Sequence, residues 1–247
     1  MIRISLGNVG SGKTVCEVRE MFLNNHVNTY SNIITKMKHQ KDIDGSMIIT
    51  KELIGEKKKR DGKTEPIYKN KLNIEFWKKV KKPINIVLDE AHSILNARKS
   101  MSTVNIIVTD WIALIRRILG NTEGVGDLVL ISQLPNRIDI IAREMANQIR
   151  YHVCHYTKVC KKCGSSWYES SETPEQLYRC WMCDSFELIK KDHVIELYFF
   201  QSIDAFEIWK NNNIKSYYKR YLITDIEKYF PLYNTLQWEN LFSDVYI

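Results

Sequence analysis

Eight consecutive residues near the start of the chain have the spacing of a phosphate-binding loop. They read GNVGSGKT and satisfy the pattern G-x-x-x-x-G-K-[ST] at every fixed position. In such a loop, backbone N–H groups and the positive end of the following helix surround phosphate groups. Lys13 would reach the outer phosphates, and the Thr14 hydroxyl would bind Mg²⁺. The predicted ATP-binding residues are Gly7, Asn8, Val9, Gly10, Ser11, Gly12, Lys13 and Thr14.

A phosphate-binding loop requires a strand before it and a helix after it, and the sequence predicts both. Residues 2–6 alternate as a strand does, and residues 15–23 have apolar positions at helical spacing. A glycine-rich turn between a strand and a helix is the context in which this motif binds phosphate, so a chance match is disfavoured.

An acid pair follows a later apolar run. Residues 84–88 read INIVL, as expected of a buried parallel strand, and Asp89 and Glu90 come directly after it. An acid pair at a strand end is often merely exposed, but the complete phosphate loop upstream favours a catalytic role. Asp89 would hold Mg²⁺ opposite Thr14, and Glu90 would orient and deprotonate the attacking water.

A third polar strand end is predicted at Gln133. Residues 127–133 read DLVLISQ, and Gln133 could hydrogen-bond the lytic water or the γ-phosphate; the alternative is a polar residue that begins a surface loop. Strands that alternate with helices indicate an open α/β sheet, whose ligand sites lie outside the carboxyl ends of its strands. We therefore expect the three polar strand ends to converge on one edge.

Four of the six cysteines form two CxxC pairs. Sixteen residues separate the pairs, and two such pairs are typical of a tetrahedral Cys₄ zinc site. Four protein ligands leave no open position, so the predicted zinc is structural. The module of residues 158–186 is predicted to be a zinc ribbon inserted at the tip of a strand pair. The predicted ligands are Cys160, Cys163, Cys180 and Cys183.

The remaining cysteines and the nearby histidines are expected to be structural. Cys16 falls in the first predicted helix and Cys154 in a strand, which favours buried thiols. His152 and His155 lie near the zinc module in sequence, but a strand histidine is more often structural than a ligand.

Composition sets broader limits. The chain has 247 residues, a formal net charge of +7 and a sequence pI near 9.0. The basic excess suggests a polyanionic partner without identifying one. The apolar runs of the chain fall far short of the roughly 20 residues that cross a bilayer, so we expect no transmembrane segment and an intracellular protein.

Two further segments leave alternatives open. Residues 36–82 are strongly basic, notably 56–63 and 77–82, which favours a solvated loop and a basic helix face over a surface that contacts nucleic-acid phosphates. Residues 214–247 are rich in tyrosine. Packing against the core is favoured there, and stacking on single-stranded nucleic acid is the alternative.

Together, GNVGSGKT, INIVLDEAH and DLVLISQ resemble the FtsK-HerA superfamily of P-loop ATPases that pump DNA. Within it the chain is most similar to the genome-packaging ATPases of archaeal and other internal-membrane DNA viruses and to the N-terminal domain of the Zot family. The resemblance covers residues 1–155 and the strand near residue 193. It implies a RecA-like core, a Walker A loop, the acid pair as Walker B, Gln133 as polar sensor, and hexameric rings that move double-stranded DNA with ATP.

The resemblance also implies an arginine finger from a neighbouring subunit, which would stabilise negative charge in the transition state. Arg117, Arg116 and Arg98 are candidates because they flank the acid and sensor strands. Asp89 to His92 spell DEAH, but the sequence shows no second RecA-like lobe, which disfavours a DEAH-box helicase. The cysteine module departs from the shared core, and the missing transmembrane segment of full-length Zot proteins weakens a toxin interpretation.

These inferences combine into one prediction. Residues 1–157 and 187–247 would form an α/β P-loop ATPase domain with a mainly parallel central sheet flanked by helices, interrupted by the zinc ribbon. The chain would be an Mg²⁺-dependent ATPase that translocates DNA, packaging a viral genome into a preformed capsid in the host cytoplasm, as a hexamer that contacts a capsid or portal-vertex protein. The alternatives are an ATP-dependent zinc-ribbon adaptor, as in a Zot-like morphogenesis factor, and a cellular DNA pump or helicase.

Overall fold

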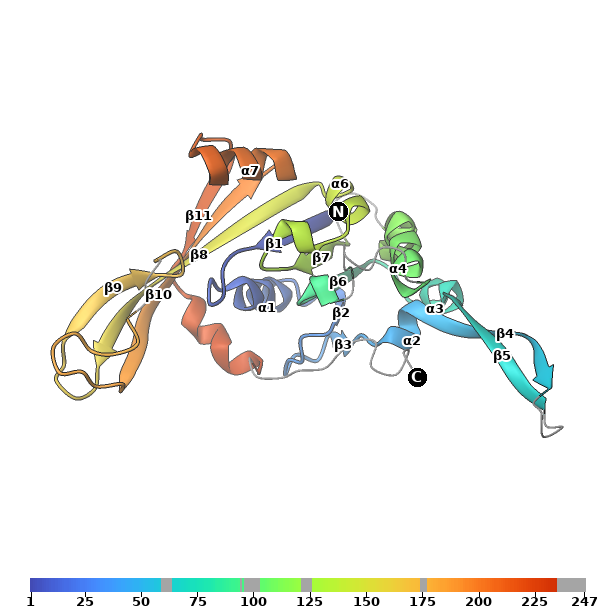
Figure 1. Ribbon diagram of the computed structural model, residues 1–247, viewed down its shortest axis with the longest axis horizontal. Coiled ribbons are helices and arrows are strands. Elements are labelled where there is room, and N and C mark those ends of the chain that lie inside the picture. Colours follow the sequence, from blue (N-terminus) through green and yellow to red (C-terminus); the bar gives the residue numbers. More distant parts are fainter. Residues whose placement is uncertain (59–63, 94, 96–102, 121–125, 174–176, 235–247) are drawn as a thin grey trace.

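The computed structural model describes residues 1–58, 64–93, 95, 103–120, 126–173 and 177–234 (Figure 1). Within this part of the chain a nine-stranded sheet has the order β11-β10-β8-β1-β7-β6-β2-β3, and β9 pairs with β8 beside this path. Its strands are β1 (Ile2–Leu6), β2 (Asn28–Ser31), β3 (Gln40–Asp42), β6 (Ile84–Leu88), β7 (Leu128–Ile131), β8 (Gln148–Cys160), β9 (Ser166–Ser170), β10 (Leu188–Phe200) and β11 (Lys219–Ile223).

The centre of the sheet is parallel. Neighbouring strands pair in parallel from β3 through β2, β6, β7 and β1 to β8, whereas β9 and β10 are antiparallel to β8, and β11 is antiparallel to β10. The fold is thus α/β with a mainly parallel sheet, which confirms the predicted fold class.

Helices lie in most connections between the parallel strands, because parallel neighbours require crossover connections. The parallel neighbours β2 and β3 are joined by residues 32–39 without a helix. No helix of the described residues combines the length and the apolar character needed to cross a membrane. The helices and 3₁₀ turns are α1 (Lys13–Leu23), α2 (Gly45–Ile48), α3 (Ile74–Lys79), α4 (Thr103–Ala113), α5 (Ile115–Leu119), α6 (Ile140–Glu144), α7 (Ile203–Asn212), η1 (Ala91–Ser93), η3 (Pro135–Arg137) and η4 (Ile226–Leu232).

Both faces of the parallel strands are buried. On β7, Leu130 belongs to the hydrophobic cluster that contains Trp111 of α4, whereas its neighbour Val129 belongs to the cluster that contains Val18 of α1. Successive side chains of a strand point to opposite faces, so α4 packs on one face and α1 on the other. This is why the central strands read as continuous apolar runs in the sequence.

Residues 36–82 differ from the predicted solvated loop. They include a two-stranded hairpin, β4 (Ile49–Lys58) and β5 (Thr64–Leu72), that projects from one end of the body (Figure 1). Most of its side chains are exposed on both faces, so the sequence lacks the alternation that reveals a strand with one buried face. Residues 59–63 of the predicted basic run lie outside the described residues. The predicted basic helix is α3, which buries Trp77 beneath its exposed lysines.

Several element bounds also differ. The helix predicted over 108–119 begins at Thr103 and is interrupted at Leu114, and the helix predicted over 137–147 is shortened to α6. Asn147 cannot continue α6, because its backbone N–H donates to Ile2 O at 2.9 Å and its side chain accepts from Ile2 N at 3.1 Å. Pairing with β1 therefore ends this helix early.

The tyrosine-rich tail packs against the body where it is described. Tyr229 is buried, and Tyr217 lies edge-on against Tyr198, with ring centroids 5.1 Å apart. Tyr218 and Tyr221 remain about half exposed. The favoured packing interpretation is thus confirmed for Tyr217 and Tyr229, and the tail beyond residue 234 lies outside the described residues.

Trp111 tests the core on the α4 face. It is fully buried, whereas Ile106 on the same helix is 50% exposed. We expect Trp111→Ala to lower the free energy of unfolding by about 3–5 kcal/mol, because a large cavity remains, and Ile106→Ala to change it by no more than about 0.5 kcal/mol. Urea denaturation of both variants measures this difference, and equal losses would contradict the described packing.

Candidate active site and metal centre

The phosphate loop connects β1 to α1 in a conformation that only glycine permits at two positions. Gly7 and Gly12 have φ angles of 150° and 85°. A Cβ at Gly7 would lie 2.6 Å from the carbonyl oxygen of His152, and a Cβ at Gly12 would overlap the side chain of Ile195. The glycines of the motif are therefore required by the close approach of β8 and β10 as well as by the turn itself.

The side chain of Lys13, the first residue of α1, folds back against the backbone of this loop. Its Nζ donates to the carbonyl oxygens of Gly7 at 2.8 Å and Asn8 at 2.9 Å. Burial lowers the pKa of Lys13, and the negative charges of Asp89 and Glu90 act in the opposite direction. The ammonium group thus lies beside the loop backbone and within the field of both acids, as its predicted role requires.

Thr14 and Asp89 meet across the sheet edge. Thr14 Oγ1 on α1 donates to Asp89 Oδ2 at 2.7 Å, and Asp89 follows β6 directly. The strand order β1-β7-β6 brings together these residues, which lie 75 positions apart in the sequence. A hydroxyl and a carboxylate oxygen are ligands that Mg²⁺ accepts alongside water, so the two residues fit the predicted metal site.

Asn32 is a site residue that the sequence reasoning missed. It follows β2, and its side chain donates to Asp89 O at 2.9 Å and accepts from Asp89 N at 2.7 Å. This reciprocal pair fixes the backbone that carries the Asp89 carboxylate. Its only signal in the sequence was a polar residue at the end of a strand that adjoins β6.

Glu90 has a strained backbone. Its φ angle is 50°, in the left-handed region, and its N–H donates to Asp89 Oδ1 at 2.8 Å. Its Oε2 lies 3.1 Å from Nδ1 of His92, and its side chain is 54% exposed. Such backbone conformations occur more often at functional sites than elsewhere, and solvent access suits a residue that must reach a water molecule.

Gln133 lies at the same edge as the loop and the acids. It follows β7, the strand between β1 and β6, and is half-buried. The preceding residue, Ser132, donates its N–H to Ser5 O at 3.0 Å and so continues the pairing of β7 with β1. The three polar strand ends thus share one edge, as the sequence predicted.

The two arginine candidates that the structure describes, Arg116 and Arg117, are not brought to this edge. Lys82, just before β6, donates its Nζ to the carbonyl oxygen of Arg117. The C-terminal end of α5 therefore adjoins the start of β6, opposite to the edge where Asp89 lies. Arg116 and Arg117 are exposed on α5, and Arg98 lies outside the described residues. A finger donated to a neighbouring subunit stays a prediction.

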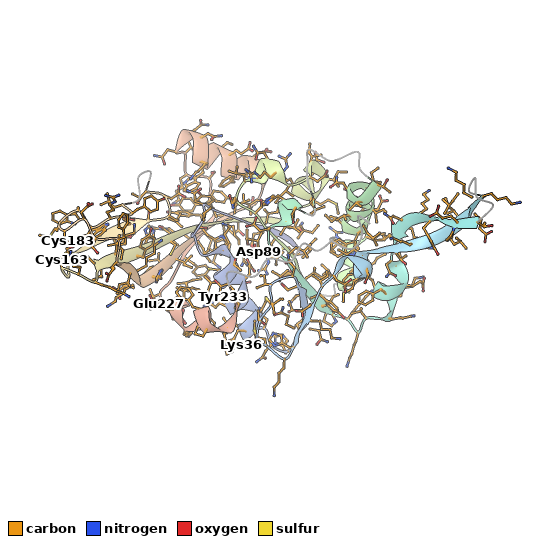
Figure 2. The ribbon with its side chains drawn as sticks, turned by 60° about the horizontal axis from the view of Figure 1, so that its bottom comes forward. Lys36, Asp89, Cys163, Cys183, Glu227 and Tyr233 are labelled. Atoms are coloured by element: carbon orange, nitrogen blue, oxygen red, sulfur yellow. The ribbon has the colours of Figure 1, made fainter. Side chains whose placement is uncertain are left out.

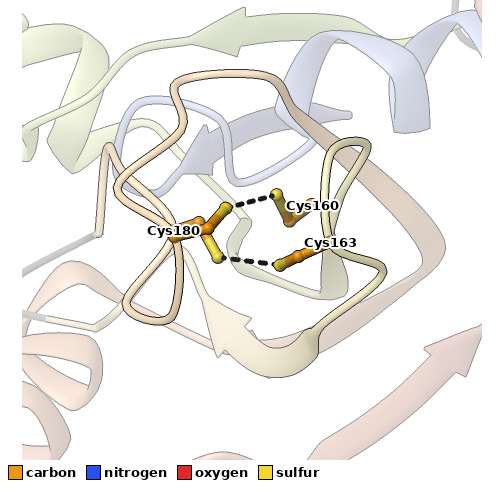
Figure 3. Close-up of side chains that lie close together, drawn as sticks. Cys160, Cys163 and Cys180 are labelled. Carbon is orange, nitrogen blue, oxygen red and sulfur yellow. Dashed lines mark hydrogen bonds between the residues drawn. The ribbon is translucent and has the colours of Figure 1, made fainter.

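The four cysteines of the CxxC pairs form one cluster at the end of the molecule opposite to the β4-β5 hairpin (Figures 2 and 3). Sγ atoms lie 3.6 Å apart for Cys160 and Cys183 and 3.5 Å apart for Cys163 and Cys180, and all four lie within 4.8 Å of one another. Zn–S bonds of about 2.3 Å in a tetrahedron separate sulfurs by about 3.8 Å, so the donor set and spacing fit zinc.

Comparison with protein-family models matches residues 1–173 to the family described as zonular occludens toxin (Zot). The chain therefore belongs to the Zot family. The match ends before the second CxxC pair of this Zot-family chain, Cys180 and Cys183. No curated protein matches the sequence.

Solved structures give weaker similarities. The N-terminal domain of zonular occludens toxin from Neisseria meningitidis is 16% identical, with a TM-score of 0.49 over 94% of this chain and 98% of that one. The DNA-packaging ATPase B204 from Sulfolobus Turreted Icosahedral Virus is 12% identical, with a TM-score of 0.37. The genome-packaging NTPase B204 from Sulfolobus turreted icosahedral virus 2, in complex with ATP-gammaS, is 13% identical, with a TM-score of 0.34. Each viral match covers 61% of this chain and 74% of the other.

A buried ion network holds α1 of this Zot-family chain on the sheet. Arg3 of β1 donates to Glu20 at 2.6 Å, and Arg150 of β8 also pairs with Glu20. Burial opposes ionisation of Glu20, but the two guanidinium groups prevail and lower its pKa to about 2. Ser5 donates to Glu17 at 2.7 Å on the same helix. These contacts, which the sequence did not reveal, position the helix that carries Lys13 and Thr14.

Neither nearby histidine is a ligand of the cysteine cluster. His152 is fully buried, its Nδ1 lies 3.0 Å from Leu6 O, and burial lowers its pKa to about 3. It is therefore neutral and donates from Nδ1 to the residue before the phosphate loop. His155 pairs with Glu196 at 2.9 Å. Both have structural roles, as expected, and Cys16 and Cys154 are buried thiols.

The metal content tests the cysteine cluster. We expect one zinc ion per chain after purification and dialysis against a weak chelator, and loss of that zinc in Cys163→Ser because a thiolate ligand is removed. Cys154→Ala, which changes a cysteine outside the cluster, should keep its zinc. Elemental analysis measures all three proteins, and full zinc retention in Cys163→Ser would contradict the assignment.

His152 should make stability depend on pH. Its pKa is lowered from 6.5 to about 3 in the folded chain, so below pH 6.5 the unfolded chain takes up a proton that the folded chain does not. Between about pH 7.5 and about pH 5 this should lower the free energy of unfolding by about 2 kcal/mol. His152→Gln, which can still donate to Leu6 O, should lose about 2 kcal/mol less over that range.

Urea denaturation at the two pH values measures this difference directly. Other titrating groups contribute equally to the wild type and to His152→Gln, so the comparison isolates the histidine. The same pH dependence in both proteins would show that His152 is not held neutral by its burial.

Proposed function

We propose that this Zot-family chain binds ATP with Mg²⁺ at the phosphate loop and hydrolyses it. The observation that carries the proposal is the 2.7 Å contact between Thr14 Oγ1 and Asp89 Oδ2, beside the buried ammonium group of Lys13. A hydroxyl, a carboxylate and an ammonium group beside a phosphate loop are the groups that hold a nucleoside triphosphate with its metal.

The residues around this contact would each have a separate role in hydrolysis. Lys13 would pair with the outer phosphates, and Thr14 and Asp89 would hold Mg²⁺, which would neutralise charge that develops on the phosphates. Glu90 would accept the proton of the attacking water, and Gln133 would orient that water or the γ-phosphate. Arg117 of a neighbouring subunit would serve as the arginine finger, since it lies away from the site of its own chain.

DNA is the proposed substrate of the motor. The net charge of +7 favours a polyanionic partner, and the strand-ending Gln133 after the acid pair resembles the arrangement in DNA-pumping ATPases. We infer translocation of double-stranded DNA by a hexamer, with packaging of a viral genome into a capsid at a portal vertex in the host cytoplasm as the biological setting. Residues 1–157 and 187–247 would be the motor, and residues 158–186 a module stabilised by zinc.

One observation favours a second candidate, the adaptor. Several large side chains of the zinc module are mostly exposed, with 64% of Trp181, 66% of Phe186 and 79% of Tyr178 accessible. Exposed apolar side chains gathered in one module are typical of a protein contact surface. In this function, ATP binding would switch the docking of the module onto a capsid or assembly protein.

Steady-state ATP hydrolysis tests the motor function. We expect Mg²⁺-dependent turnover that double-stranded DNA stimulates, and a loss of at least about 100-fold in Glu90→Gln, because that variant lacks the general base. Glu90→Gln should still bind ATP. His92→Gln, which changes the neighbour of the Glu90 carboxylate, is the matched control and should retain most of the turnover.

Two results would contradict the proposal at different levels. Turnover in Glu90→Gln that equals the wild type would remove Glu90 from the mechanism. ATP hydrolysis that no DNA stimulates, in a well-folded, zinc-loaded oligomer, would exclude the motor and favour the adaptor.

A further inference from the structure

The zinc module contacts the phosphate loop directly. Asn8, the second residue of the loop, donates from Nδ2 to Ser171 O at 3.1 Å and to Glu172 Oε1 at 3.0 Å. Ser171 and Glu172 form the turn that follows β9, and we call them the β9 turn. The contact joins segments more than 160 positions apart in the sequence.

Glu172 is the centre of this contact. Its Oε1 also accepts from the hydroxyl of Tyr151 on β8 at 2.6 Å, and its Oε2 accepts from Nζ of Lys210 on α7 at 2.6 Å. Lys210 donates to the Tyr151 hydroxyl as well, at 2.7 Å. One carboxylate thus links the loop, a central strand and α7, and its orientation is fixed on both oxygens.

The β9 turn is also fixed to β8. Ser171 N donates to Cys154 O at 2.8 Å, and Cys154 N donates to Ser171 Oγ at 3.0 Å. The preceding strand β9 pairs with β8 along its whole length and begins three residues after Cys163. The turn therefore lies in the segment between the two CxxC pairs, and a metal held by all four cysteines would join the two ends of that segment.

Asn8 connects this segment to Lys13, the residue of the loop that would bind the outer phosphates. Its side chain is held by the β9 turn, and its carbonyl oxygen accepts from Nζ of Lys13 at 2.9 Å. A shift of the turn would move Asn8, and a shift of Asn8 would change the backbone that faces the ammonium group. The loop and the β9 turn therefore cannot rearrange independently.

We propose that Glu172 is a positioning residue for nucleotide binding, and that it couples the cysteine metal centre to the phosphate loop through Asn8. This inference rests on the proposed nucleotide function and adds a means of regulation to the same site. Zinc would fix the β9 turn, the turn would hold Asn8, and the loop would be kept ready for phosphate. Coupling between two sites is reciprocal in their binding free energies, so bound nucleotide must also strengthen the binding of zinc.

Nucleotide affinity tests the positioning role. A fluorescent ADP analogue with Mg²⁺ is titrated into the zinc-loaded full chain. Asn8→Ala and Glu172→Ala should bind it about 5- to 100-fold more weakly. Glu172→Gln, which keeps an oxygen acceptor for the Asn8 amide, should recover part of the loss. Glu187→Gln, which changes an exposed carboxylate directly after the module, should bind like the wild type.

The zinc affinity tests the coupling with a readout that a purely structural role would not change. In equilibrium competition with a chromophoric chelator, the wild type and Glu187→Gln should hold zinc more tightly with the ADP analogue bound. In Asn8→Ala, nucleotide at saturating concentration should no longer strengthen zinc binding, although the zinc content without chelator is unchanged. Asn8 is exposed, so its replacement leaves the core intact, and circular dichroism verifies this.

The outcomes separate this inference from the function on which it rests. A wild type that binds no nucleotide would overturn the proposed nucleotide function and the coupling together. A wild type that binds nucleotide, while Asn8→Ala binds it equally well and nucleotide has no effect on the zinc affinity, would overturn the coupling alone.

Discussion

The structure depends on how closely β8 and β10 approach the phosphate loop. A Cβ at Gly7 would lie 2.6 Å from the His152 carbonyl oxygen, and Gly12, beside Ile195, has a φ angle of 85° that favours glycine, so side chains at these positions would disturb the loop. A loop that must surround phosphate with its backbone has to be formed before the ligand arrives. Here the antiparallel pair beside the parallel strands supplies that constraint, and the same pair continues outwards to the cysteine cluster.

The edge that carries the proposed catalytic groups is held in place from several neighbouring elements. The buried network of Arg3, Glu20 and Arg150 fixes α1 on the sheet and so sets the direction of Thr14. Asn32 fixes the backbone of Asp89 from the neighbouring strand. Metal sites need their ligands oriented by surrounding hydrogen bonds. The short distance between Thr14 and Asp89 is thus the result of packing from both sides of the edge.

The central strands, the sheet edge where the predicted site residues meet and the cysteine cluster could be predicted because their signals are local in the sequence. Residues 2–6 and 84–88 are buried on both faces and therefore apolar throughout, and GNVGSGKT and the CxxC pairs have fixed spacings. The β4-β5 hairpin could not be recognised, since solvent on both faces removes the apolar alternation. Asn32 and Glu172 act through contacts between distant segments, which no local pattern records.

The most direct test of the account is the Mg²⁺ dependence of ATP binding at equilibrium, measured by calorimetry for the wild type and Thr14→Val. Valine has the shape of threonine but lacks the hydroxyl that lies 2.7 Å from the Asp89 carboxylate. Mg²⁺ should strengthen ATP binding to the wild type by about tenfold or more, which corresponds to about 1.4 kcal/mol. It should have little effect on ATP binding to Thr14→Val. The same Mg²⁺ enhancement in both proteins would show that the metal is not held where Thr14 and Asp89 meet.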